Sequence, residues 1–147
     1  MTLEECCEKP ETYKAVNFPD TPENRELFKR AIEFNEKIEK EYGRYLIVNG
    51  IKLFFYDFGP KDGTPLVWSH GIVSNGVSFS VIAQELASAG YRVLALDHRG
   101  HGNTRITDYS FTIYDMADDI KGLMDFLSID KAVMGGFLQG EIGRAHV

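Results

Sequence analysis

The sequence is poor in cysteine, has no excess of basic residues and contains no long apolar run, and each absence argues against a class of protein. Its only two cysteines, Cys6 and Cys7, are adjacent, so they cannot readily bridge each other or staple a fold. The 16 basic residues are outnumbered by 22 acidic ones, giving a net charge of −6, which argues against a nucleic-acid groove. No apolar run approaches the ~20 residues of a membrane span, and residues 1–10 lack the basic and apolar regions of a secretory signal. We therefore expect a cytoplasmic protein with neither nucleic-acid nor membrane partners.

What is present is an ordinary globular composition, and 147 residues are enough for one domain with a sizeable core. Residues 1–20 show no sustained periodicity, and we interpret them as a loose N-terminal arm. Thr21 and Pro22 then form a helix start signal, a capping hydroxyl followed by proline at the first helical position. The apolar residues that follow recur every three or four positions and predict an amphipathic helix over 21–43, packed by one stripe: Leu27, Ala31, Phe34, Ile38 and Tyr42.

The segment from residue 44 onward has the pattern of a hairpin followed by alternating strands and helices. Asn49-Gly50, the strongest two-residue turn signal, separates strand patterns at 45–48 and 51–56. A continuous apolar strand follows at 65–69, a second buried strand at 91–96 and a last strand at 131–134, with helices between them. The first of these helices is expected to turn four apolar residues inward: Phe79, Ile82, Ala83 and Leu86. This order predicts an α/β fold, a mostly parallel sheet with an N-terminal antiparallel hairpin and helices on both faces.

Reactive groups in such a sheet collect in loops at the carboxyl ends of the strands, and here these loops are marked by glycine. In Ser69-His70-Gly71-Ile72, the turn allows the Ile72 amide to point at the oxygen of a bound acyl group. Gly136-Phe137-Leu138-Gln139-Gly140 has the spacing of a nucleophile elbow, a sharp turn that pushes its central side chain outward. The amides of Gln139 and Ile72 would then form an oxyanion hole. The central residue, Leu138, has no atom that can attack a carbonyl.

Three motifs in this order and spacing resemble the α/β-hydrolase family, and in particular its esterase, lactonase and haloperoxidase-like branch: His70-Gly71, Asp97-His98-Arg99-Gly100-His101-Gly102 and Gly136-Phe137-Leu138-Gln139-Gly140. The resemblance identifies residues 44–140 as the N-terminal half of such a domain. It implies a hydrolase of an ester, lactone or similar acyl bond that uses no cofactor. The family usually has serine at position 138, and its acid and histidine follow later strands. The chain is therefore expected to be inactive as written.

The histidines and acids of these loops also have structural interpretations. In the family context His70, His98 and His101 are expected to fix loop geometry by hydrogen bonds, and no metal site is expected. Asp97 follows the wrong strand for a triad acid, so we expect it to anchor the Arg99 loop. The remaining loop-shaping residues are Gly71, Gly100, Gly102, Gly136 and Gly140. Asp115, Asp118 and Asp119 are interpreted as the solvated start of a helix rather than a carboxylate site.

Residues 141–147 are interpreted as an artefact of sequencing or assembly. They can be encoded by GAG ATC GGA AGA GCA CAC GTC, which from its third base reads as a common sequencing adapter, and the adapter's next codon is a stop. Two other interpretations stay open for the whole chain: a non-catalytic protein that binds a small ligand, and a non-functional fragment. The intact parent would take a small-molecule acyl substrate or ligand. The sequence indicates neither which substrate nor an oligomeric state.

Overall fold

The computed structural model describes residues 19–137, which form parts of two compact units, Met1–Glu33 and Phe34–Val147. The predicted arm up to residue 18 and everything from Leu138 onward, including Gln139, Gly140 and the proposed artefact at 141–147, lie outside the described residues. Between residues 19 and 137, none of the helices combines the length and the apolar character that crossing a bilayer requires.

The helix expected over 21–43 is α2, Pro22–Tyr42. The hydroxyl of Thr21 accepts a hydrogen bond from the Asn24 amide at 3.2 Å, as the start signal predicted. Burial along the helix is less extensive than the apolar stripe suggested. Ile38 is its buried residue, and Tyr42 packs against Phe58 with ring centroids 4.5 Å apart, whereas Leu27, Ala31 and Phe34 are exposed. An amphipathic period shows which face of a helix can be covered, but not how much of its length is covered.

The predicted hairpin is formed by β1, Gly43–Val48, and β2, Ile51–Phe58. Asn49 and Gly50 both adopt positive φ angles, 47° and 78°, which a two-residue type I′ turn requires at both positions. This turn brings Val48 opposite Ile51 in the antiparallel ladder. The hairpin's register therefore follows directly from the Asn-Gly pair.

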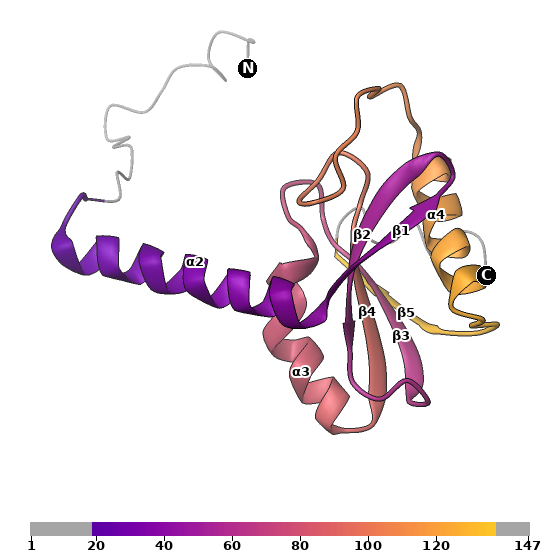
Figure 1. The fold of residues 1–147 in the computed structure, drawn as a ribbon, viewed down its shortest axis with the longest axis horizontal. Helices are drawn as coiled ribbons and strands as arrows, with labels where there is room; N and C mark the ends of the chain where they lie inside the picture. Colours follow the sequence, from indigo (N-terminus) through magenta and orange to yellow (C-terminus); the bar gives the residue numbers. More distant parts are fainter. Residues whose placement is uncertain (1–18, 138–147) are drawn as a thin grey trace, which may run out of the picture. The chain divides into compact units, whose positions relative to one another are not determined.

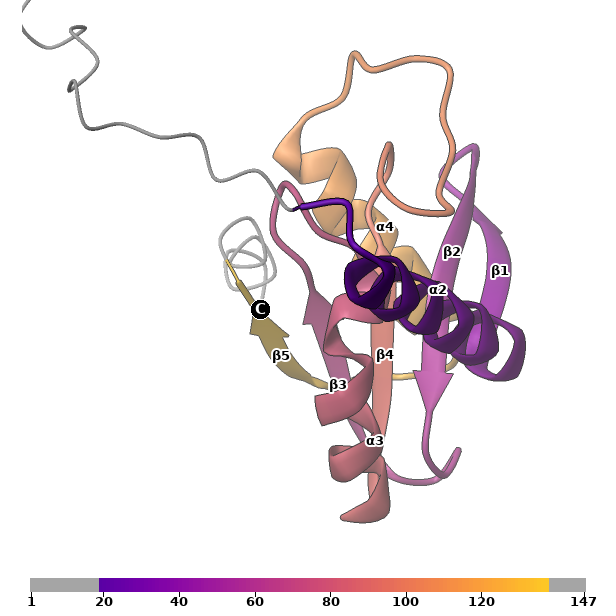
Figure 2. The ribbon, with the colours of Figure 1, turned by 90° about the vertical axis from the view of Figure 1, so that its left-hand side faces the viewer.

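Three more strands complete a sheet in the order β1-β2-β4-β3-β5 (Figures 1 and 2). They are β3, Thr64–Ser69, β4, Tyr91–Asp97, and β5, Val133–Gly136. β2 joins β4 antiparallel, while β3 lies parallel between β4 and β5. The α/β fold class, with an antiparallel hairpin on a parallel sheet, is confirmed. The last strand begins two residues later than the predicted 131–134, because it takes its register from β3.

Helices cover both faces of the sheet, as Figure 2 shows for α3 and α4. On one face, Leu94 and Leu96 of β4 pack with Ile120 and Leu123 of α4, Ile113–Phe126. On the other face, the alternating residues Val93 and Ala95 pack with Phe79 and Ala83. Phe79 ends a short 3₁₀ helix, Gly76–Phe79, that leads into α3, Ser80–Ser88. Both faces of the central strand are therefore buried.

One member of the inward set predicted for α3 is wrong. Ile82 is 54% exposed, whereas Ala83 is fully buried and Leu86 packs against the same core. Each helical position turns by ~100°, so a helix that packs through Phe79, Ala83 and Leu86 turns Ile82 toward the edge of the contact.

Candidate active site

The carboxyl ends of β3 and β5 lie side by side and bring two of the predicted loops together. Ser69 is the register partner of Gly136, and the Phe137 N–H donates a hydrogen bond to the Ser69 carbonyl at 3.2 Å. The chain that follows β5 therefore starts beside the predicted oxyanion loop, residues 70–72. Leu138, Gln139 and Gly140 themselves lie beyond the described residues, so the predicted nucleophile position and the predicted second oxyanion donor are not tested by the structure.

His70 is buried behind this junction and has one defined tautomer. Its Nδ1 lies 2.7 Å from the Gly71 carbonyl, and its Nε2 lies 3.0 Å from the backbone N of His98. Since a carbonyl only accepts and a backbone N–H only donates, the ring is neutral, with its proton on Nδ1. Burial lowers the pKa of His70, which favours the same neutral form, although the hydrogen bond to Gly71 opposes the shift.

Ser69 and His98 form a pair that resembles a nucleophile with its base but is closed to solvent. Ser69 Oγ lies 2.5 Å from His98 Nε2, and the two residues are 0% and 1% exposed. Among residues 19–137 His98 Nδ1 has no hydrogen-bond partner, so the favoured tautomer carries its proton on Nε2 and leaves a bare lone pair at Nδ1. Burial lowers the pKa of His98 to about 3, with smaller contributions from His70 and His101. The pair therefore joins β3 to β4 and cannot meet a substrate.

Asp97 uses both carboxylate oxygens on backbone amides. Oδ1 accepts from the Gly76 N–H at 2.6 Å and Oδ2 from the Asn103 N–H at 2.8 Å. Burial raises the pKa of Asp97, and these two hydrogen bonds oppose the shift. Gly102 closes against the carboxylate at φ 47°, where an added Cβ would collide with it. The side chain therefore holds the turn after β4 against the start of the 3₁₀ helix.

Asp119 corrects the prediction of a solvated acidic helix start. Its carboxylate is 1% exposed and accepts hydrogen bonds from Arg99 Nε and Nη2, both at 2.7 Å. Asn49 Nδ2 donates to the same carboxylate at 3.1 Å. The sequence did contain a signal, because position 119 is three residues after Met116 and four before Leu123, both buried. Asp118 is exposed, and Asp115 forms a capping box with Thr112.

His101 lies between the turn after β4 and the predicted oxyanion loop. Its Nε2 is 2.7 Å from the Ile72 carbonyl, and its Nδ1 is 3.2 Å from the Arg99 carbonyl. Gly100, with φ 78°, allows the tight turn that places this ring. Within residues 19–137 no group of three or more His, Cys, Asp or Glu side chains is arranged to hold a metal ion.

Residues 64–140 match the family model described as the alpha/beta hydrolase fold. The chain belongs to the α/β-hydrolase fold family. Among curated relatives, a non-heme chloroperoxidase from Streptomyces lividans is 36% identical over 95 residues, which make up 63% of this chain and 33% of that protein. A bifunctional esterase/perhydrolase from Acinetobacter calcoaceticus is 29% identical over 93 residues, again 63% of this chain and 33% of the relative.

Solved structures show the same relationship. The crystal structure of epoxide hydrolase VrEH1 from Vigna radiata superposes with a TM-score of 0.64 at 31% identity, covering 68% of this chain and 32% of that one. The chain thus spans about a third of the length of the relatives it matches.

At the junction of β3 and β5, the α/β-hydrolase sheet has a cavity of about 230 Å³. Its walls are mostly apolar, and its polar side chains come from the loop after β3 and from the 3₁₀ helix that follows it. The lining residues are Trp68, His70, Gly71, Ser74, Ser78, Phe79, Ile82 and Phe137. An apolar space beside a few backbone and side-chain donors is the usual form of a small-molecule site.

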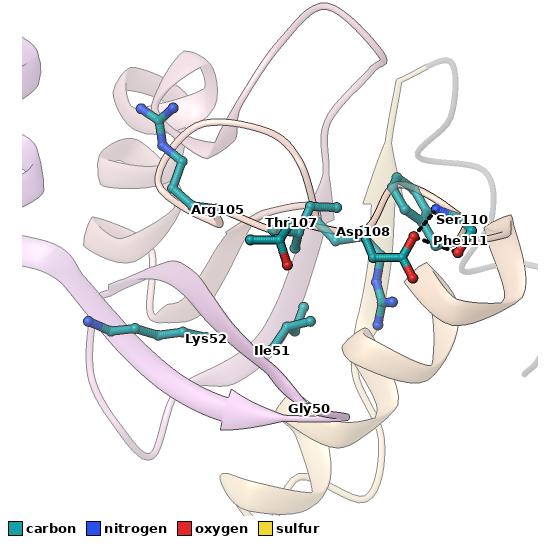
Figure 3. A pocket seen from close by; sticks show the side chains of 10 residues that line it. Gly50, Ile51, Lys52, Arg105, Thr107, Asp108, Ser110 and Phe111 are labelled. Carbon is teal, nitrogen blue, oxygen red and sulfur yellow. Dashed lines mark hydrogen bonds between the residues drawn. The ribbon is translucent and has the colours of Figure 1, made fainter.

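A larger pocket of about 360 Å³ lies between the hairpin turn and the loop before α4 (Figure 3). Asp108 accepts hydrogen bonds from the Ser110 amide and hydroxyl, while Lys52 and Arg105 extend away from it (Figure 3). Its charged groups do not converge on a common point. The junction of β3 and β5 is therefore the better candidate for chemistry.

Proposed function

We propose that this chain carries the N-terminal part of a hydrolase that cleaves an ester, lactone or similar acyl bond of a small molecule. The observation that carries the proposal is the hydrogen bond from the Phe137 N–H to the Ser69 carbonyl, because it holds Phe137, the residue before position 138, against the end of β3, where His70 and Gly71 line the same cavity. In the proposed mechanism a serine at position 138 attacks the carbonyl, a histidine takes its proton, and the Ile72 and Gln139 amides hold the oxyanion. No cofactor takes part. The protein is proposed to act in the cytoplasm.

With Leu138 the proposed mechanism has no nucleophile, so we expect no turnover of p-nitrophenyl acetate by the chain as written. The measurement is p-nitrophenolate release by protein whose mass confirms this sequence, against a denatured sample. A Leu138→Cys variant serves as the positive control, since a thiol is nucleophilic with little help from a base. Compared with the unsubstituted chain, which already carries the thiols of Cys6 and Cys7, it should release one additional p-nitrophenolate per chain, and faster than when denatured. Two outcomes would contradict the proposal. One is multiple turnovers by the unsubstituted chain, and the other is a Leu138→Cys variant whose new thiol reacts no faster in the folded protein than in the denatured one.

A second candidate is a non-catalytic binding protein, and the observation that favours it is an apolar-lined cavity that includes Phe137, in a sequence with leucine at position 138. Trp68, the only tryptophan, lines that cavity and reports binding by its fluorescence. Saturable quenching by phenyl acetate without hydrolysis, together with a leucine codon at position 138 in the gene, would favour the binding protein. A serine codon in the gene would favour the enzyme.

A further inference from the structure

The peptide units on both sides of Ile72 are held by histidine side chains. The Gly71 carbonyl accepts from His70 Nδ1–H at 2.7 Å and from the Ser74 amide at 3.1 Å. The Ile72 carbonyl faces His101 Nε2 at 2.7 Å and can only accept, so the ring donates. The two histidines belong to different loops, His70 to the one after β3 and His101 to the one after β4.

These hydrogen bonds set the direction of one backbone N–H. In a planar trans peptide the carbonyl and the following N–H point in opposite directions. Holding the Gly71 carbonyl therefore aims the Ile72 N–H away from His70, and among residues 19–137 this N–H donates to no backbone or side-chain acceptor. The hydrogen bond to the Ile72 carbonyl also restrains the following peptide unit. The peptide units on both sides of the Ile72 Cα are therefore restrained. A free amide held in one direction is what oxyanion stabilisation needs.

His101 is itself firmly placed. The turn that carries it is anchored at Asp97, which accepts from the Asn103 amide, and at Arg99, which is paired with Asp119. The ring also lies 5.0 Å from the ring of His70, so the two side chains brace the same short loop. Ile72 and Val73 are 56% and 92% exposed, so burial of their own side chains contributes little to holding this loop.

We infer that His101 is a positioning residue of the proposed acyl site, and that its Nε2–H, bound to the Ile72 carbonyl, keeps the Ile72 amide aimed at the oxyanion. This inference rests on the proposed function. His101 acts through the backbone of Ile72, so the property that matters is an N–H donor at this position rather than the imidazole ring.

The test compares His101→Phe, which keeps a ring but has no N–H, with His101→Gln, which keeps an N–H donor. Both are made in the Leu138→Cys background, and acylation by p-nitrophenyl acetate is followed at several concentrations. His101→Phe should lower the limiting acylation rate by about tenfold or more without weakening apparent binding, because small misplacements of catalytic groups are costly. His101→Gln should stay within about threefold of the Leu138→Cys rate, since it restores the donor.

A second measurement needs no activity. In the chain as written, labelled with ¹⁵N and ¹³C, a scalar coupling across the hydrogen bond should connect His101 Nε2 with the Ile72 carbonyl carbon. His101→Phe should shift and broaden the Ile72 amide resonance, and His101→Gln should restore it.

The outcomes separate the two proposals. A Leu138→Cys chain that is acylated no faster than its denatured form contradicts the acyl site, while the coupling still decides whether His101 holds Ile72. Rapid acylation that His101→Phe leaves unchanged, or the absence of the coupling in the chain as written, would overturn the inference about His101.

Discussion

At the scale of single residues, the buried histidines are held in the neutral state by their surroundings. His98 is enclosed just after β4, with Ser69 on one ring nitrogen and, in the described part of the chain, no hydrogen-bond partner on the other. An imidazolium there would place an N–H at Nδ1 without an acceptor and lose most of its hydration. His70 is neutral for a second reason, because its Nε2 must accept the His98 amide. The hydrogen bond between the His98 amide and His70 Nε2 thus requires an unprotonated His70 ring.

The depressed pKa of His98 predicts that the protein loses stability as the pH falls below 6.5. The unfolded chain takes up a proton near the ordinary value of 6.5, whereas the folded protein does not until about pH 3. Between these values the unfolded state binds more protons, so the free energy of unfolding falls with decreasing pH. Urea denaturation at pH 7, 6 and 5 measures this slope.

The matched control for this prediction is His98→Gln, which can still reach Ser69 but does not titrate. It should show a shallower dependence on pH over the same range, with His70 and the carboxylates unchanged in both proteins. Equal slopes for the two proteins would mean that His98 is not the group responsible.

At the scale of secondary-structure elements, polar contacts tie the loop after β4 to its neighbours. Arg99 reaches α4 through Asp119, and Asn49 brings the hairpin turn to the same carboxylate. Thr104 Oγ1 accepts the Phe54 amide at 2.8 Å, which fastens this loop to β2. These contacts hold the candidate site from its β4 side.

Asp119→Asn should destabilise the protein by about 3 kcal/mol, because it leaves the largely buried Arg99 guanidinium without its carboxylate. Asp118→Asn, on the preceding residue of the same helix and exposed, should change stability by less than about 0.5 kcal/mol. The free energy of unfolding from urea titrations at pH 7 measures both. Similar small effects for the two variants would show that the buried pair contributes little.

At the scale of the whole molecule, the sheet has an open side at β5. Among residues 19–137, β5 pairs with β3 and with no strand on its other edge. Val133 is 50% exposed on this strand, and Phe137, just beyond it, is 64% exposed. Unpaired edges with apolar side chains are templates for pairing with other chains.

We therefore expect the isolated chain to self-associate through β5, and Val133→Lys to increase its monomeric fraction by placing a charge on the edge. Light scattering after size-exclusion chromatography measures that fraction across protein concentrations. Val81→Lys, at an exposed valine of α3, is the control and should have little effect. An equal gain from both variants would indicate a general effect of charge instead of edge pairing.

Much of the fold could be predicted from local pattern. The hairpin followed from Asn49-Gly50, since few residue pairs tolerate two positive φ angles, and the order of the later strands followed from their apolar runs. The misses share a physical cause. Ile82, Asp119 and the register of β5 depend on which neighbour covers a position, and that neighbour is distant in sequence.

The sequence by itself determined the class of fold, the glycine-marked loops and the presence of leucine at position 138, because these depend on residue type and spacing along the chain. Only the tertiary structure decided that Phe137 donates to the Ser69 carbonyl, that Asp119 binds Arg99, and that His101 holds the carbonyl of Ile72. Each of these hydrogen bonds joins loops or elements that meet only when the strands and helices have packed. Each pair forms because folding brings the two residues close together, and the order of residues in a single sequence does not show which residues will be close.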